Sequence, residues 1–167
     1  IKKYDKGIYY IPKKTMLKAT VGPSADMVAR YRFVTKGEEI FGYYSGNSFA
    51  NQLGISMQVP RKIEIVSNNS NSSPREIEIG GRKFLIRKSS IVINRENVYV
   101  LQLLELLKNI EVYMDGSYDE ARVKIEEYID IHDIRKESVN RYIREFPINV
   151  FKNYYELGLD NVFAQRK

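Results

Sequence analysis

The sequence predicts an α+β fold in which a small, mainly antiparallel sheet packs on helices and is followed by a C-terminal helical bundle. Residues 61–67, 75–79 and 82–88 alternate apolar and charged side chains, a pattern typical of half-buried strands. From residue 94 onward the apolar residues recur at helical spacing. Residues 41–60 contain no charged side chain, although charged residues make up 29% of the chain. We expect this charge-free segment to be buried and the rest of the chain to pack on it.

Residues 1–14 are expected to form a strand surrounded by lysines. The β-prone stretch lies between Ile8 and Ile11, and lysines precede and follow it. Lysines beside an edge strand hinder pairing with another strand, and they also suit contacts with phosphate groups. The residues alone leave both interpretations open.

A first helix is expected after Gly22-Pro23-Ser24, with Pro23 or Ser24 at its start and Gly37 as its stop. Its apolar face is predicted to consist of Met27, Tyr31 and Val34. In the charge-free segment, residues 41–44 are predicted to be extended. A short helix capped by Ser45 or Asn47 then ends at Gly54.

Three strands are expected over residues 61–67, 75–79 and 82–88. The last two are joined by Gly80-Gly81, and a type I′ turn requires positive φ at two successive residues. These two strands should therefore form a hairpin. The side chains expected on its core-facing side are Ile77, Ile79, Phe84 and Ile86.

Helices are predicted for the rest of the chain. A core helix should span residues 94–108 with Asn94 as its N-cap, because most of its circumference is apolar. Ser117 and Glu120 have the spacing of a capping box. Two further helices are expected from Asp133 to the residue before Pro147 and from there to Gly158. The side chains predicted to face inward from these last three helices are Ala121, Ile125, Tyr128, Ile129, Val139, Tyr142, Ile143, Phe146, Val150, Phe151, Tyr154 and Leu157.

The charge of the chain is divided unevenly. Residues 1–90 carry a net charge of +9 and residues 91–167 a net charge of −3. This asymmetry predicts an anionic partner for the first part, with a solvated basic surface that has no partner as an equal alternative. The residues selected as possible phosphate contacts are Lys2, Lys3, Lys6, Lys13, Lys14, Arg82, Lys83, Arg87 and Lys88.

The residues that carry enzyme chemistry are few. The chain has no cysteine and one histidine, His132, which we interpret as a helix-start or surface residue. Glu64, Glu76 and Glu78 lack the spacing of a metal-dependent nuclease and fit a solvated sheet face better. We expect no catalytic residue, no metal and no cofactor. No apolar run is long enough to cross a membrane, and we expect a cytoplasmic protein.

Two motifs resemble the AbiEi-type antitoxins of bacterial abortive-infection (type IV toxin–antitoxin) systems. The segment GIYYIP at residues 7–12 is similar to the "kGvYyxP" segment of that family. The charge-free segment is similar to its "SG…AN.LGLSTQVP" signature, with a departure at Ser48-Phe49, where relatives tend to have two small residues. The resemblance covers residues 6–108. The matching positions, expected to be structural, are Gly7, Tyr9, Tyr10, Pro12, Ser45, Gly46, Ala50, Asn51, Leu53, Gly54, Gln58, Val59 and Pro60.

The resemblance implies a role and a domain plan. In that family the antitoxin represses its own operon and counters a nucleotidyltransferase-like toxin without needing a stable complex with it. Residues 1–14 would be the last strand of the wing of a truncated N-terminal winged-helix domain, which mainly binds the operator DNA. Residues 15–167 would be the C-terminal antitoxin domain. The alternative is a nucleic-acid-processing enzyme with a degenerate nuclease-like fold.

Overall fold

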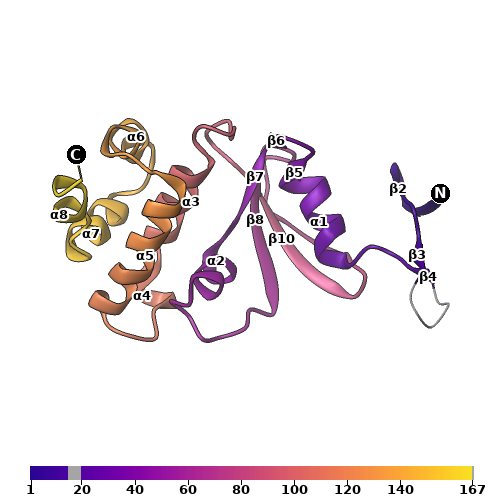
Figure 1. The fold of residues 1–167 in the computed structure, drawn as a ribbon, viewed down its shortest axis with the longest axis horizontal. Helices are drawn as coiled ribbons and strands as arrows, with labels where there is room; N and C mark the ends of the chain where they lie inside the picture. Colours follow the sequence, from indigo (N-terminus) through magenta and orange to yellow (C-terminus); the bar gives the residue numbers. More distant parts are fainter. Residues whose placement is uncertain (15–19, 167) are drawn as a thin grey trace.

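A four-stranded sheet lies between a helix on one face and two helices on the other in the computed structural model, which describes residues 1–14 and 20–166 (Figure 1). The sheet order is β7 (Gly42–Ser45), β8 (Lys62–Ser67), β10 (Arg82–Lys88) and β9 (Arg75–Ile79). Helix α1 (Ala25–Phe33) covers one face, and α2 (Gly46–Leu53) and α3 (Val98–Leu107) cover the other. The predicted α+β fold is confirmed.

The sheet contains one parallel pairing among antiparallel ones. β9 and β10 form the predicted hairpin around Gly80-Gly81, and both glycines have positive φ. β7 and β8 are also antiparallel, whereas β10 runs parallel to β8 with Phe84 opposite Ile63. Residues 68–74 connect β8 to β9, which is the edge strand rather than the neighbour of β8. The chain then returns as β10, which lies between β8 and β9 and runs parallel to β8. The prediction of a mainly antiparallel sheet therefore holds with this one exception.

The face of the sheet toward α1 is apolar. The predicted hairpin residues Ile77, Ile79, Phe84 and Ile86 lie there with Ile63 and Ile65. They pack against α1 through Val28, Ala29 and Phe33. The predicted face of α1 was wrong in part, because Met27 and Tyr31 are 62% and 48% exposed while Val34 is buried.

Helix α1 is shorter than predicted. Ser24 is its N-cap and accepts a hydrogen bond from the Met27 amide at 3.2 Å, as expected from the sequence. The helix ends at Phe33, and Gly37 instead occupies the turn between β5 (Thr35–Lys36) and β6 (Glu39–Ile40) with a φ of +58°. The chain turns there because the Phe41 amide donates a hydrogen bond to the Val34 carbonyl, which closes the β5–β6 hairpin.

The N-terminal residues form an antiparallel hairpin. The single strand predicted over residues 1–14 is divided in the structure: β1 (Lys2–Asp5) pairs with β2 (Ile8–Tyr10), and β3 (Lys13–Lys14) pairs with β4 (Thr20–Val21). Tyr4 and Ile8 pack against the α1 cluster, and Asp5 lies 3.8 Å from Arg32 of α1.

The other face of the sheet receives α3. Tyr43 and Val66 pack against Val98 and Leu101 of that helix. Helix α3 begins three residues later than the sequence predicted, because Asn97 rather than Asn94 is its N-cap. The Asn94 side chain instead accepts hydrogen bonds from the amides of Glu96 and Asn97 at 2.9 and 3.0 Å, which forms a turn ahead of the helix.

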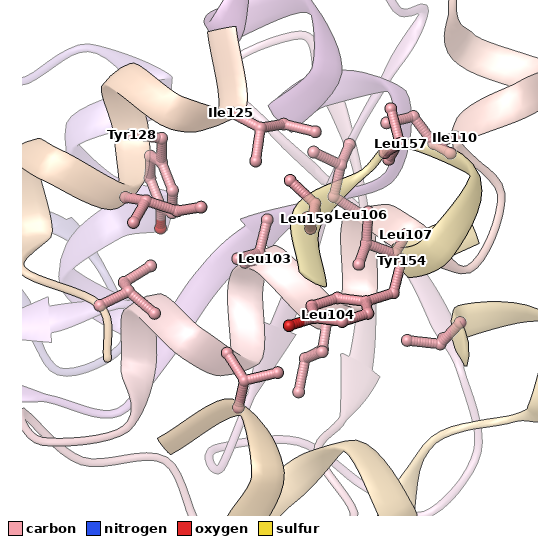
Figure 2. Packing of buried hydrophobic residues seen from close by; sticks show 14 of the residues in the cluster. Leu103, Leu104, Leu106, Leu107, Ile110, Ile125, Tyr128, Tyr154, Leu157 and Leu159 are labelled. Carbon is pink, nitrogen blue, oxygen red and sulfur yellow. The ribbon is translucent and has the colours of Figure 1, made fainter. Parts of the chain in front are cut away.

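Helices pack around the remaining side of α3. They are α4 (Ile110–Tyr113), α5 (Tyr118–His132), α6 (Lys136–Tyr142), the 3₁₀ turn η1 (Ile143–Glu145), α7 (Ile148–Glu156) and α8 (Leu159–Ala164). Figure 2 shows leucines of α3 meeting side chains of α5, α7 and α8 in one cluster. The capping box of Ser117 and Glu120 is confirmed. No helix in the described part of the chain has the length and apolarity to traverse a bilayer.

Two boundaries in this helical part differ from the prediction. Asp133 adopts a left-handed conformation that ends α5, so it does not begin the next helix. Helix α8 was not predicted, because Gly158 was interpreted as the end of the last helix. Gly158 has a φ of +71° and turns the chain directly into α8, which buries Leu159, Val162 and Phe163.

His132 is the last residue of α5, and its ring stacks on Tyr99 with the centroids 3.7 Å apart. Burial lowers its pKa, since the charged imidazolium loses hydration there. The unfolded chain therefore binds a proton at a pH where the folded chain does not, and acidification through about pH 6.5 should destabilise the fold. The variant His132→Phe keeps a stacking ring but has no group that binds a proton in this range. When the pH is lowered from about 7.5 to about 5.5, we expect the melting temperature of this variant to fall less than that of the wild type. Identical losses in calorimetry would contradict this role.

Candidate functional site

Two hairpins that are far apart in sequence bring basic residues together. A Cβ added at Gly80, in the β9–β10 turn, would lie 3.1 Å from the Tyr4 hydroxyl oxygen of β1. The turn therefore touches the N-terminal hairpin. The exposed basic side chains in β1, in the turn that follows it and at the start of β10, called the basic end below, are Lys2, Lys3, Lys6, Arg82 and Lys83.

The basic end is accessible, and one of its cations has an ion pair within the chain. Arg82 pairs with Asp26 of α1 at 2.6 Å, but both side chains are about half exposed. Lys13 is also exposed and lies in β3, just after the N-terminal hairpin. The side chain of Lys14 lies outside the described part of the structure. Most of the residues predicted to contact phosphates in the first segment are therefore on the surface.

The structure separates Arg87 and Lys88 from the basic end. They lie at the opposite end of β10, roughly 17 Å from Arg82 at the rise of an extended strand. Arg87 points to the α3 face of the sheet and its side chain is 29% exposed. It binds Glu105 at 2.8 Å, and Lys108 binds the same carboxylate oxygen at 3.2 Å. The four cations of the β9–β10 hairpin that were predicted to contact phosphates therefore do not form one surface.

The predicted glutamates have separate partners. Glu64 accepts a hydrogen bond from the Asn47 amide at 3.2 Å in the first turn of α2. Glu76 pairs with Lys62 at 2.7 Å, and this hydrogen bond lowers the pKa of the Glu76 carboxyl. Glu78 is exposed in β9. Among residues 1–14 and 20–166 no group of three or more acidic or histidine side chains is placed to hold a metal ion.

The motif residues of the charge-free segment mainly shape the backbone. Ser45 and Ala50 are buried, and Gly54 ends α2 in the left-handed conformation. Gly46 has a φ of +58°, and a Cβ there would lie 1.6 Å from the Glu64 carboxylate. A side chain at this position would therefore displace Glu64 from the start of α2.

Asn51 ties the rest of the motif to α2. Its side-chain amide donates to the carbonyl groups of Ser56 and Gln58 at 3.1 and 3.2 Å. The loop bearing Val59 and Pro60 is thereby held beside the helix, with Val59 exposed. Leu53 is partly buried against the helical core.

The N-terminal motif residues shape the first hairpin. Gly7 has a φ of +77° in the β1–β2 turn, and Tyr9 is exposed on β2. A Cβ added at Gly22 would lie 3.2 Å from the Tyr10 ring, so Tyr10 packs where the chain approaches α1. Pro12 is half-buried between β2 and β3.

A groove of about 580 Å³ runs along the free edge of β7, and sequence reasoning did not anticipate it. Residues of α1, α2, α3 and the loop bearing Val59 line this edge groove. Its walls come from many segments that are far apart in the sequence, and no local sequence signal marks such an arrangement. Arg30 and Arg82 line the end nearest the basic end.

Comparison with known protein families gives a match. Residues 1–135 match the family described as "Family of unknown function (DUF6088)". No curated protein matches the chain. No solved structure matches it either.

Proposed function

The chain belongs to the DUF6088 family, a family of unknown function, and we propose that it is a DNA-binding autorepressor and antitoxin. Its contact with DNA is made through the phosphate backbone at the basic end. The proposed role requires no catalysis by this chain.

The observation that carries the proposal is the convergence of exposed cations from β1, its turn and the start of β10. Affinity for DNA comes mainly from neutralising phosphates and releasing counterions, for which clustered lysines and arginines are suited. The N-terminal hairpin meets the β9–β10 turn at Tyr4 and Gly80, and the cations of the basic end remain exposed there. The exposed Tyr9 ring lies between lysines on the same hairpin and adds a surface for sugar or base contacts.

The antitoxin part of the proposal is supported by the resemblance of the GIYYIP and charge-free segments to the AbiEi-type antitoxins. In this role residues 1–14 belong to a winged-helix unit that reads the operator, and residues 15–167 form the antitoxin domain. Counteraction of a nucleotidyltransferase-like toxin is functional and needs no stable complex. Co-expression tests the antitoxin role separately from DNA binding. The gene should restore growth to cells that express a nucleotidyltransferase gene from its own genomic neighbourhood. Absence of rescue would contradict the antitoxin role.

Residues 1–167 should bind DNA weakly and without sequence preference. We expect a Kd of roughly 10⁻⁴–10⁻⁶ M at physiological salt, because lysines at the basic end contact phosphates rather than base edges. The combined variant Lys2→Ala, Lys3→Ala and Lys6→Ala should flatten the dependence of log K on log salt by about 0.9 for each phosphate that the protein no longer neutralises. Titration of labelled duplexes at several salt concentrations measures this slope.

The matched control removes three exposed cations from the helical part, through Lys136→Ala, Arg141→Ala and Lys152→Ala. This variant has the same change in net charge and should keep the wild-type slope. Equal slopes for all three proteins would contradict the assignment of DNA binding to the basic end. Tight binding that distinguishes operator from scrambled DNA would contradict the phosphate-only contact.

A further inference from the structure

We propose that the edge groove beside β7 is a binding site for a small anion that carries a flat ring, the chemical class to which mononucleotides belong. The groove is separate from the basic end, except that Arg82 lines both. Its volume of about 580 Å³ lies within the roughly 300–1,000 Å³ of small-molecule pockets. The inference does not depend on the proposed role in DNA binding.

The β7 edge of the groove offers a hydrogen-bond donor, although Asp26, which also lines the groove, keeps one buried carboxylate oxygen without a hydrogen-bond partner among the described residues. The Tyr44 carbonyl accepts a hydrogen bond from the Gln102 side chain at 2.9 Å. This carbonyl therefore points away from β8, the strand with which β7 pairs. In an antiparallel pair the amide of a residue points to the same side as its carbonyl, which places the Tyr44 N–H on the groove. The Gln102 side-chain carbonyl is already occupied by the Tyr128 hydroxyl. At Tyr44 the strand edge therefore offers a donor rather than an acceptor.

Charge at one end of the groove favours an anion. Arg30 and Arg82 both line this end of the groove. Burial raises the pKa of the Tyr44 hydroxyl, and the positive charges of the two arginines oppose that rise. Asp26 neutralises Arg82 through the 2.6 Å ion pair. Arg30 has no ion pair within the described part of the chain, which leaves one uncompensated positive charge beside the Tyr44 hydroxyl. A phosphate or carboxylate placed there would meet a guanidinium and a hydroxyl.

The rest of the groove suits a flat ring. Its walls include the apolar side chains of Val34, Ile40 and Val98 and the aromatic ring of Tyr99. Ser48, Asn51 and Gln52 of α2 close the far side, and Gln52 is exposed. Ligand sites combine apolar and aromatic walls with a few polar groups that fix orientation, as this groove does. The shared chemistry is therefore a ring joined to an acidic group.

The test measures binding of AMP, UMP and indole-3-acetate to the full chain, with inorganic phosphate and adenosine as partial ligands. Isothermal titration and thermal shift at about 1 mM ligand detect affinities in the range expected for such a site. We expect at least one ring-bearing anion to bind and to raise the melting temperature more than phosphate or adenosine does. Nucleotides and aromatic carboxylates are separated by which of the three full ligands binds more tightly.

Two variants locate the site. Arg30→Gln should weaken binding about tenfold or more by removing a charge-assisted contact, and Tyr44→Phe should weaken it severalfold while keeping the ring. Arg141→Gln, an exposed arginine on α6, is the matched control and should bind as the wild type. Melting curves without ligand establish that each variant is folded. The proposal is overturned if no ring-bearing anion binds, if phosphate alone reproduces the effect, or if Arg30→Gln binds as tightly as the control.

Discussion

Replacing Leu104 by aspartate is expected to lower the free energy of unfolding by about 3–5 kcal/mol. Leu104 is fully buried in α3, where it lies in the cluster shared with α7 and α8 (Figure 2). An aspartate there would place a carboxylate among apolar side chains with no cation to pair with. Urea denaturation monitored by circular dichroism measures the change.

The control is Val123→Asp, on the exposed side of α5. Val123 is 53% exposed and lies between Arg122 and Lys124, so a carboxylate there remains hydrated. We expect a change of about 0.5 kcal/mol or less. A Leu104→Asp protein as stable as Val123→Asp would mean that α3 is not the core helix of this fold.

Gly42→Ala is expected to cost about 1–3 kcal/mol, although the substitution adds a single methyl group. A Cβ at this position would lie 1.9 Å from the Phe33 carbonyl oxygen and 3.0 Å from that of Val66. Both atoms belong to the backbone, and the Phe33 carbonyl also accepts a hydrogen bond from the Ser67 hydroxyl at 2.6 Å. Strand β7 and the end of α1 would have to separate to make room. The midpoint of thermal unfolding reports the cost.

Gly22→Ala is the matched substitution for Gly42→Ala. The atoms nearest to its added Cβ belong to the Tyr10 side chain, at 3.2 Å, and a side chain moves more easily than a strand. The destabilisation there should be smaller than at Gly42. If both variants melt together with the wild type, the close approach of α1 to β7 is not a constraint on the fold.

Local patterns predicted the elements that depend on neighbouring residues. The Gly80-Gly81 hairpin and the Ser117 capping box each involve a few consecutive positions, and the structure has both. The parallel pairing of β10 with β8 joins residues about twenty positions apart, and no turn sequence specifies it. The steric constraint at Gly42 could not be predicted from neighbouring residues either, because the Phe33 carbonyl that imposes it belongs to a different element.

The candidate site was predictable only as a list of charges. Composition identified Arg82 and Arg87 as equivalent members of a basic hairpin. Strand alternation and the position of α3 make them different, since Arg87 faces Glu105 while Arg82 remains at the surface. Arg30 was not selected, because its importance arises from the edge groove that distant segments form.

The parallel pairing of β8 and β10 has a consequence for the order in which the chain folds. The β9–β10 hairpin closes through a two-residue turn and can form within microseconds on its own. β10 can pair with β8 only after the connection at residues 68–74 has formed and brought the hairpin back to β8. This slower, long-range step sets the register of the sheet. We therefore expect substitutions in the Gly80-Gly81 turn to slow refolding, whereas exposed changes in α8 should act mainly on the unfolding rate.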